Sequence, residues 1–279
     1  MNPDNYLQRA RDELKKDNKI GALSILEEGN TRFRDSRIGE LLEKIRGELS
    51  HLQDMQSYRA FYERQQRKPE KYYKFTRRLE RKIRRWLGRS TRRVVEGCLR
   101  NPRYLRLEKD IREGGYRDIL DLGCWEGHFA VALGARNPSI RVTGMDIAST
   151  NIEIANELNR FPNVRFQQGA AEDVVKLFPA ESFDFVMLFE ILEHVIDVEH
   201  VLAAALAVLK PGGKIAITVP VAEEEEEEGH HDEHVRFFSD GLIQELFGSK
   251  PDLAIDTVPH PPRPGKAQEF SRYITFRKT

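Results

Sequence analysis

A short loop with one acid and two glycines is the segment of the sequence best suited to binding chemistry. Asp121 lies two residues before Gly123, and Gly127 follows four residues later. Glycine permits a tight turn and lets a ligand or a helix approach the backbone closely. An adjacent carboxylate repels a pyrophosphate and attracts an ammonium or sulfonium group. The loop therefore predicts a cationic ligand and differs from the G-x-G-x-x-G loop that binds dinucleotides.

Two further positions complete the outline of that ligand. Asp146 ends the next apolar run, where a carboxylate can accept hydrogen bonds from ribose hydroxyls. Ala171 and Glu172 follow the third run, where backbone and carboxylate groups can meet an exocyclic amine. A ligand with a ribose, an adenine and a positive charge but no phosphate is S-adenosylmethionine, which we expect as the cofactor.

The elements that must position these residues are predicted from Tyr116 onward. Five apolar runs are typical of buried parallel strands: 119–122, 142–145, 164–166, 185–188 and 215–219. Helical patterns fill the gaps between them, as at 151–159 and 198–209. Two last runs, 253–258 and 273–276, have no helix between them and favour an antiparallel pair at the sheet edge. The expected fold class is α/β, a doubly wound, mostly parallel, Rossmann-like sheet of seven strands.

With these features, residues 116–279 resemble the class I S-adenosylmethionine-dependent methyltransferases. The matching segments are Asp-Leu-Gly-Cys-Trp-Glu-Gly at 121–127, Gly-Met-Asp at 144–146, 168–173, 183–185, Glu-Ile-Leu-Glu-His at 190–194 and Leu-Lys-Pro-Gly-Gly at 209–213. The resemblance implies that the loop lines the methionine end, Asp146 the ribose, and Ala171 with Glu172 the adenine. It also implies that Phe189 and Glu190 lie near the sulfonium.

Two positions depart from the family pattern. Trp125 stands where many members have glycine, so a positive φ is costly there. Ala170 stands where many members have an aspartate, which leaves the adenine contact to the three residues that follow it. Neither departure removes the acid and the glycines of the loop.

The motif Glu190-x-x-Glu193-His194 looks most like two subgroups, the ubiquinone-biosynthesis O-methyltransferases and the small-RNA 2′-O-methyltransferases. Both are associated with a divalent metal, which implies Mg²⁺ or Mn²⁺ on these three residues and on His234. Spacings of three and four residues would place the three on one face of a helix. The alternative is that Glu193 and His194 only cap and orient that helix.

Independently of a metal, His194 and His234 are the candidate general bases, with Glu190 as a third candidate catalytic residue. The histidines at 51, 128, 200 and 260 have no cluster around them in the sequence. We interpret these four as surface or packing residues.

The chain divides into three predicted regions: a helical appendage at 1–54 that weakly resembles a tetratricopeptide pair, a basic helical segment at 55–115, and the binding domain at 116–279. From Arg64 to Lys109 there are 18 Lys and Arg against four acids, a net charge of +14. The apolar stripe of Phe75, Leu79, Ile83 and Trp86 makes this segment amphipathic. It favours an anionic membrane surface or RNA as a partner, with packing on the next domain as the alternative.

Composition narrows the class of protein. Apolar residues make up 39% and charged residues 32% of the 279, which favours a soluble globular chain. The longest apolar run is 201–209, and a membrane-spanning helix needs about 18 residues. Two cysteines and a polar N-terminus argue against a disulfide framework and a secretory signal. We expect a cytoplasmic protein, with peripheral membrane binding as an extension.

Three functions follow from the sequence as hypotheses. The first is O-methylation of a small, sugar or lipid-linked acceptor by S-adenosylmethionine. The second is an RNA methyltransferase that uses the basic segment to bind phosphates. The third is a non-catalytic, cofactor-binding interaction protein whose first 50 residues bind a partner or a second copy. The acceptor, the oligomeric state and the role of the six glutamates at 223–228 are not indicated by the sequence.

Overall fold

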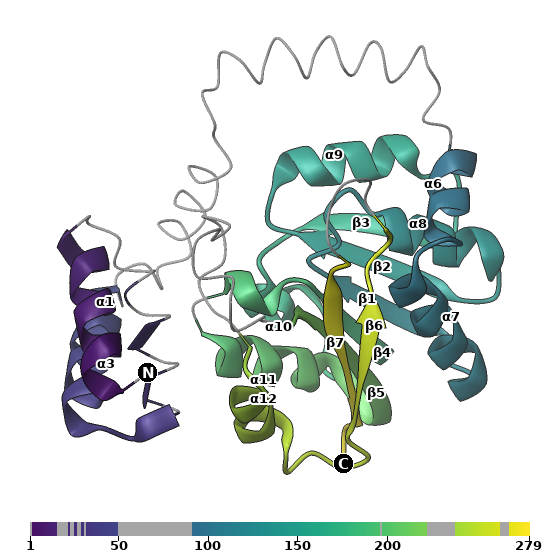
Figure 1. The fold of residues 1–279 in the computed structure, drawn as a ribbon. Coiled ribbons are helices and arrows are strands. Elements are labelled where there is room, and N and C mark those ends of the chain that lie inside the picture. The colour runs from purple at the N-terminus through teal and green to yellow at the C-terminus, as the bar shows by residue number, and fades with distance from the viewer. Residues whose placement is uncertain are drawn as a thin grey trace, which may run out of the picture.

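The computed structural model describes most of the binding domain and part of the N-terminal appendage (Figure 1). The described residues are 2–15, 22, 25, 26, 29, 30, 32–49, 91–195, 197–221, 238–262 and 268–279. The amphipathic stripe of the basic segment, the glutamate run at 223–228 and His234 lie outside them. The predictions made for those residues therefore stay predictions.

A seven-stranded sheet with the order β3-β2-β1-β4-β5-β7-β6 forms the binding domain. Its strands are β1 (Asp118–Leu122), β2 (Arg141–Asp146), β3 (Val164–Gln168), β4 (Phe183–Phe189), β5 (Leu209–Pro220), β6 (Ala254–Pro259) and β7 (Phe270–Arg277). The first five run parallel, and β7 is antiparallel to both of its neighbours. Every predicted strand is present, so the expected fold class is confirmed.

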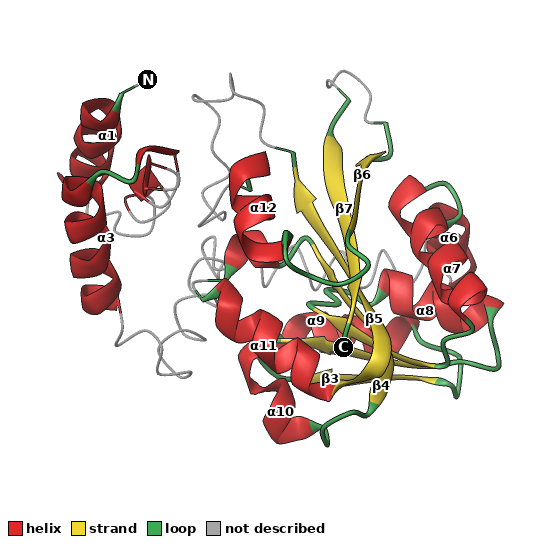
Figure 2. Cartoon of the chain, turned by 90° about the horizontal axis from the view of Figure 1, so that it is seen from below, coloured by secondary structure: helices red, strands yellow, loops and turns green. Residues whose placement is uncertain are grey.

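Helices cover both faces of the sheet (Figure 2). On one face lie α6 (Thr91–Cys98), α7 (Pro102–Gly114) and α8 (His128–Arg136); on the other lie α10 (Val174–Leu177), α11 (Val198–Val208) and α12 (Asp240–Phe247). The remaining helical elements are α9 (Ser149–Leu158) and the 3₁₀ turns η2 (Ala171–Asp173) and η3 (Leu192–His194). Because both faces are covered, the central strands are apolar on both sides and are fully buried.

The helix α7 links the basic segment to the sheet. Asn101 caps its start, and Gly115 ends it with a φ of 67°. Tyr104 and Leu107 are buried against β4 in one core cluster. This helix brings the guanidinium of Arg103 to the carboxyl end of β4, where it pairs with Glu190. The packing alternative concerns the apolar stripe at 75–86, which lies outside the described residues, so it stays a prediction.

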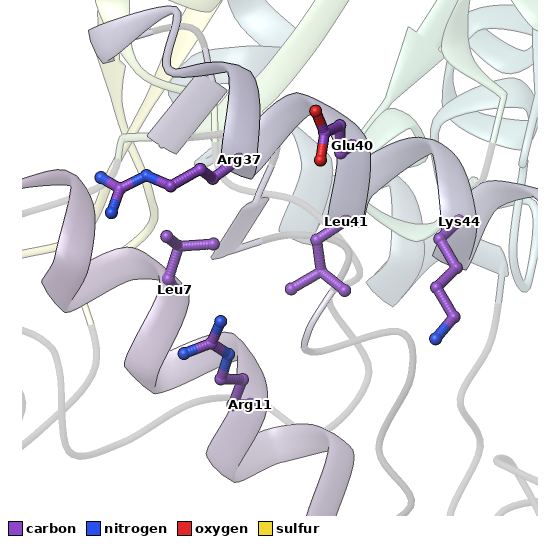
Figure 3. Close-up of a pocket in the computed structure, with 6 residues that line it drawn as sticks. All are labelled: Leu7, Arg11, Arg37, Glu40, Leu41 and Lys44. Carbon is purple, nitrogen blue, oxygen red and sulfur yellow. The ribbon is translucent and has the colours of Figure 1, made fainter.

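The N-terminal appendage has a small core of its own. It contains α1 (Pro3–Lys15) and α3 (Ser36–Leu49), with further helical residues between them. Buried side chains from both helices, such as Leu7, Ala10 and Leu42, form one cluster. Figure 3 shows a shallow hollow between α1 and α3, into which Leu7 and Leu41 point. None of the predicted site residues lines it.

Within the described residues, no helix combines the length and the apolar character that crossing a bilayer requires.

Candidate active site

The glycine loop after β1 has a backbone that only glycine accommodates at two positions. Gly123 has a φ of 75°, and a Cβ there would come within 2.7 Å of the Ile191 side chain. Gly127 has a φ of 72°, and a Cβ would come within 2.5 Å of Phe166. The positive φ makes another residue costly, and together with the lack of space for a Cβ it excludes other residues at these two positions. The close approach predicted for Gly127 is made by the protein itself.

Trp125 adopts a positive φ, the conformation that the sequence indicated would be costly at this position. Its φ is 49°, so the loop takes the left-handed conformation without a glycine, at a strain of about 1–2 kcal/mol. The Trp125 N–H donates a hydrogen bond of 2.9 Å to Asp146 Oδ2, which offsets part of that strain. The indole ring lies outside the core, with 56% of the residue exposed.

The two acids of the predicted cofactor site are both buried but differ in their partners. Asp146 Oδ1 accepts hydrogen bonds from Ala148 N and Asn151 Nδ2, at 2.9 and 3.1 Å. Asp121 accepts no hydrogen bond from any described residue. Burial, and secondly the charge of Asp146, raise the pKa of Asp121 to about 8. Burial also raises the pKa of Asp146. A positively charged ligand beside Asp121 would favour its ionised form.

The segment predicted for the adenine follows β3 as the turn η2. Ala171 is buried, and burial raises the pKa of Glu172. The turn follows Gly169, whose N–H donates to Asp146 O at 3.0 Å. This backbone bond brings the third loop next to the end of β2, so the predicted ribose and adenine positions are neighbours.

Glu190 follows β4 with a φ of 52°. Its Oε1 lies 3.2 Å from Arg103 Nη1 and accepts a hydrogen bond of 3.0 Å from Ser271 Oγ. Its Oε2 lies 3.9 Å from His260 Nε2, and that nitrogen is 2.5 Å from Ser271 Oγ. The end of β4 therefore meets α7 and the β6–β7 pair at the Glu190 carboxylate.

The described part of the predicted metal set does not fit a metal site. Glu190 lies outside the turn η3, which holds only Glu193 and His194, so the expected single helical face does not form. Arg103 already supplies a cation to Glu190. Glu193 is 1% exposed with an unpartnered Oε2, and burial followed by the Glu190 charge raises its pKa well above the usual range. Among the residues that the structure describes, no three His, Cys, Asp or Glu are grouped to hold a metal ion.

The sequence reasoning missed three residues of this cluster: Arg103, His260 and Ser271. His260 was interpreted as a surface or packing residue, but its side chain is 11% exposed and contacts the Glu190 cluster. In the structure His260 N donates to Glu269 O at 2.8 Å, which extends the antiparallel pairing of β6 and β7. The predicted antiparallel pair put His260 beside the end of a strand but gave no register, so it was only a partial signal. Arg103 had no such signal.

Comparison with known proteins gives matches to the sheet domain. A family model described as a methyltransferase domain matches residues 120–217. The ubiquinone biosynthesis O-methyltransferase of Pseudomonas fluorescens is 35% identical over 101 residues, which cover 36% of this chain and 42% of that protein. The protein of the same name from Idiomarina loihiensis is 37% identical over 101 residues, covering 36% and 40%. The match thus spans less than half the length of these curated relatives.

Solved structures also align with this chain. The YcgJ protein of Bacillus subtilis aligns with 58% of this chain and 92% of its own, at 21% identity and a TM-score of 0.46. The family model, by contrast, is a sequence match that runs from β1 into β5 and contains the glycine loop, Asp146 and Glu190. Residues 120–217 of the sheet domain therefore match a methyltransferase domain, which supports the class I S-adenosylmethionine-dependent methyltransferase expected from the sequence.

Proposed function

We propose that the protein transfers a methyl group from S-adenosylmethionine to an oxygen atom of a small, sugar or lipid-linked acceptor. The observation that carries this proposal is the state of Asp121, a buried carboxyl beside the glycine loop without a hydrogen-bond donor among the described residues. A cationic methionine end supplies both the charge and the donors that this carboxyl lacks. The names of the two curated relatives support oxygen as the methylated atom.

The proposed roles of the other cofactor-binding residues follow from their positions. Asp146 is oriented by three donors of the protein, and its Oδ2, which accepts one of them, keeps capacity to accept from a ribose hydroxyl. Ala171 and Glu172 would meet the adenine from the turn η2. Phe189 and Glu190, at the end of β4, would flank the sulfonium.

The chemistry asks two things of the protein. S-adenosylmethionine supplies an activated methyl group, which leaves sulfur by an in-line displacement. The protein must hold the acceptor oxygen in line with the breaking bond and take up its proton. Glu190 and His194 are the described candidates for the proton, and His234 is the candidate outside the described residues.

Calorimetric titration tests the cofactor directly. S-adenosylmethionine and S-adenosylhomocysteine are titrated into the full chain, into Asp146→Ala and into Asp118→Ala. We expect micromolar binding that is lost in Asp146→Ala and kept in Asp118→Ala, whose carboxylate lies at the opposite end of β1 and pairs with Lys210. Absence of binding to the unmodified chain would refute the proposed function.

The basic segment supports a membrane surface as the proposed working place of a cytoplasmic enzyme, with RNA as the competing partner. Part of its charge is used inside the domain, since Arg103 pairs with Glu190 and Arg106 with Asp256 at 2.8 Å. Flotation with anionic and with neutral liposomes separates the cases. Binding to anionic liposomes alone supports the membrane; binding only to RNA, with a steep salt dependence, supports the second hypothesis. Cofactor binding without any turnover would favour the non-catalytic interaction protein.

A further inference from the structure

The carboxylate of Glu190 already has a cation of the protein beside it. Arg103 Nη1 lies 3.2 Å from Glu190 Oε1, and the two side chains are 15% and 25% exposed. A divalent metal on the same oxygen would be repelled by the guanidinium at short range. A quarter of the Glu190 side chain remains open to a ligand, so the carboxylate is reachable although it is paired.

Rigid elements hold Arg103 in this position. It is the second residue of α7, two positions after the capping residue Asn101, whose side chain accepts from Arg103 N at 3.0 Å. Tyr104 and Leu107 anchor the same helix with 0% exposure. Among the described residues, the Arg103 Nε is buried without a hydrogen-bond partner, and its Nη1 pairs with Glu190.

A buried pair supports Glu190 from the opposite side. Ser271 on β7 has 0% exposure, and its hydroxyl donates to Glu190 Oε1. With that proton committed, His260 Nε2 is the donor of the 2.5 Å contact to Ser271 Oγ. His260 Nδ1 faces Glu269 Oε2 at 3.4 Å, so a carboxylate lies at each end of the ring.

Aromatic rings lie next to this cluster. Phe189 immediately precedes Glu190 and meets the rings of Phe129 and Tyr273 edge to face, at centroid distances of 6.0 and 5.7 Å. Phe129 and Phe189 are only partly buried. The polar cluster around Glu190 therefore has aromatic side chains on one side, and an acceptor with an aromatic ring can pack on the partly buried Phe129 and Phe189.

We propose that Arg103, Ser271 and His260 form, around Glu190, a site for a neutral aromatic hydroxyl in which the guanidinium takes the place of a divalent metal. This rests on the proposed function. The acceptor O–H bond breaks and its proton passes to Glu190. An oxygen lone pair forms the bond to the methyl carbon, and the sulfur–carbon bond breaks with its electron pair left on sulfur. Arg103 stabilises the negative charge that develops on the oxygen.

Glu190 and Arg103 are the catalytic residues in this scheme, because both touch the acceptor. Ser271 and His260 act through Glu190 and are positioning residues. Ser271, which His260 contacts in turn, holds Oε1 of Glu190. The other oxygen, Oε2, is then the one that contacts the acceptor. A conservative change at Ser271 therefore lowers turnover without changing the affinity for S-adenosylmethionine.

The first experiment measures metal binding without any turnover. The full chain is stripped with EDTA and desalted, and Mn²⁺ is titrated while the free ion is followed by electron paramagnetic resonance. We expect no stoichiometric uptake. Uptake of one equivalent that disappears in Glu190→Gln would overturn the proposal, while leaving the proposed function untouched.

The second experiment uses catechol as the acceptor and mass spectrometry of S-adenosylhomocysteine as the readout. Turnover in EDTA should equal turnover in Mg²⁺. Arg103→Met should lower it about 100-fold, as loss of one group that stabilises developing charge does elsewhere. Arg103→Lys keeps a cation and should recover part of the loss. Ser271→Ala should lower the rate less than Arg103→Met, with unchanged cofactor affinity.

A pH profile distinguishes chemistry from a damaged fold. The deficit of Arg103→Met should shrink as rising pH ionises the catechol, because a phenolate formed in solution no longer needs the guanidinium to form. Arg136→Met, which removes an Arg–Glu pair with Glu108 elsewhere in the domain, is the matched control and should keep full turnover. No turnover of catechol, although S-adenosylmethionine binds, would reject the aromatic acceptor; a metal requirement would reject the role of Arg103.

Discussion

The end of β2 holds its carboxylate mainly with main-chain groups, whereas the end of β4 holds its carboxylate with side chains. Asp146 accepts from the N–H groups of Trp125 and Ala148. Glu190 is contacted by Arg103 from α7, by Ser271 from β7 and by His260 beyond β6. Backbone geometry fixes the first region and side-chain identity the second. The proposed acceptor region can therefore change by substitution while the proposed cofactor region stays the same.

The difference also appears in the electrostatics. Asp121 and Asp146 are buried carboxyls with no cation beside them among the described residues, and burial raises the pKa of both. Glu190 is partly exposed and has a permanent cation 3.2 Å away. One region is poised to receive positive charge from a ligand, and the other already contains its own.

The largest expected effect comes from a substitution in the glycine loop, whose geometry is set by its backbone. Gly123→Ala adds a methyl at a φ of 75° and within 2.7 Å of Ile191, which should lower the free energy of unfolding by about 2–5 kcal/mol from strain and overpacking together. Gly115→Ala is the control, since its φ is 67° but nothing lies within 4 Å of the added Cβ. Urea denaturation should show a loss of only about 1–2 kcal/mol for the control. Equal losses would mean that the contact with Ile191 adds nothing.

An intermediate effect concerns the proton on Asp121. The folded state keeps this proton up to about pH 8, whereas the unfolded chain releases it near the ordinary value of 3.8. The native state binds more protons in between, so this contribution to stability is complete below about pH 4 and is lost as pH rises to about 8. From pH 6 to 8 we expect a loss of about 1–3 kcal/mol, absent in Asp121→Asn.

A residue at the other end of the same strand gives the opposite sign. Basic neighbours, Lys210 and Arg141, lower the pKa of Asp118 against the effect of burial. Its contribution is present above the ordinary carboxyl pKa and is lost as pH falls through the lowered one. If unfolding measured from pH 3 to 9 gave Asp118→Asn and Asp121→Asn the same profile, the electrostatic contrast would fail.

The same proton links pH to cofactor affinity. Binding of a cationic ligand beside Asp121 favours the ionised carboxyl, so affinity for S-adenosylmethionine should rise with pH, by at most about tenfold per unit, and level off near pH 8. Calorimetry in buffers of different ionisation enthalpy should detect the released proton. Asp121→Asn should bind weakly and without proton release.

The smallest expected effect comes from a substitution in the Glu190 cluster, which is held together by side chains. Ser271→Ala removes two hydrogen bonds, to Glu190 and from His260, and should cost about 1–2 kcal/mol of stability. Affinity for S-adenosylmethionine should not change, because Asp121, Asp146 and the glycine loop are unaffected. A matching loss of affinity in calorimetry would show that the two regions are coupled.

The same contrast explains what the sequence could predict. The strands and the cofactor residues come from contiguous patterns, such as the loop from Asp121 to Gly127, and those patterns fixed the fold correctly. The Glu190 cluster joins residues up to 168 positions apart, from 103 to 271, and only the pairing of the last two strands pointed to part of it. The motif from 190 to 194 suggested a helical face, but the positive φ of Glu190 ends the regular geometry there.

The exposed Trp125 provides an optical consequence of the loop conformation. The chain has two tryptophans. The main-chain N–H of Trp125 donates to Asp146, and the centroid of its indole lies 5.6 Å from that of the His128 ring. Any occupant of the loop changes the solvent around that indole. In a Trp86→Phe background its emission becomes a single-site fluorescence signal, and stopped-flow mixing can then time ligand arrival at the loop without a label.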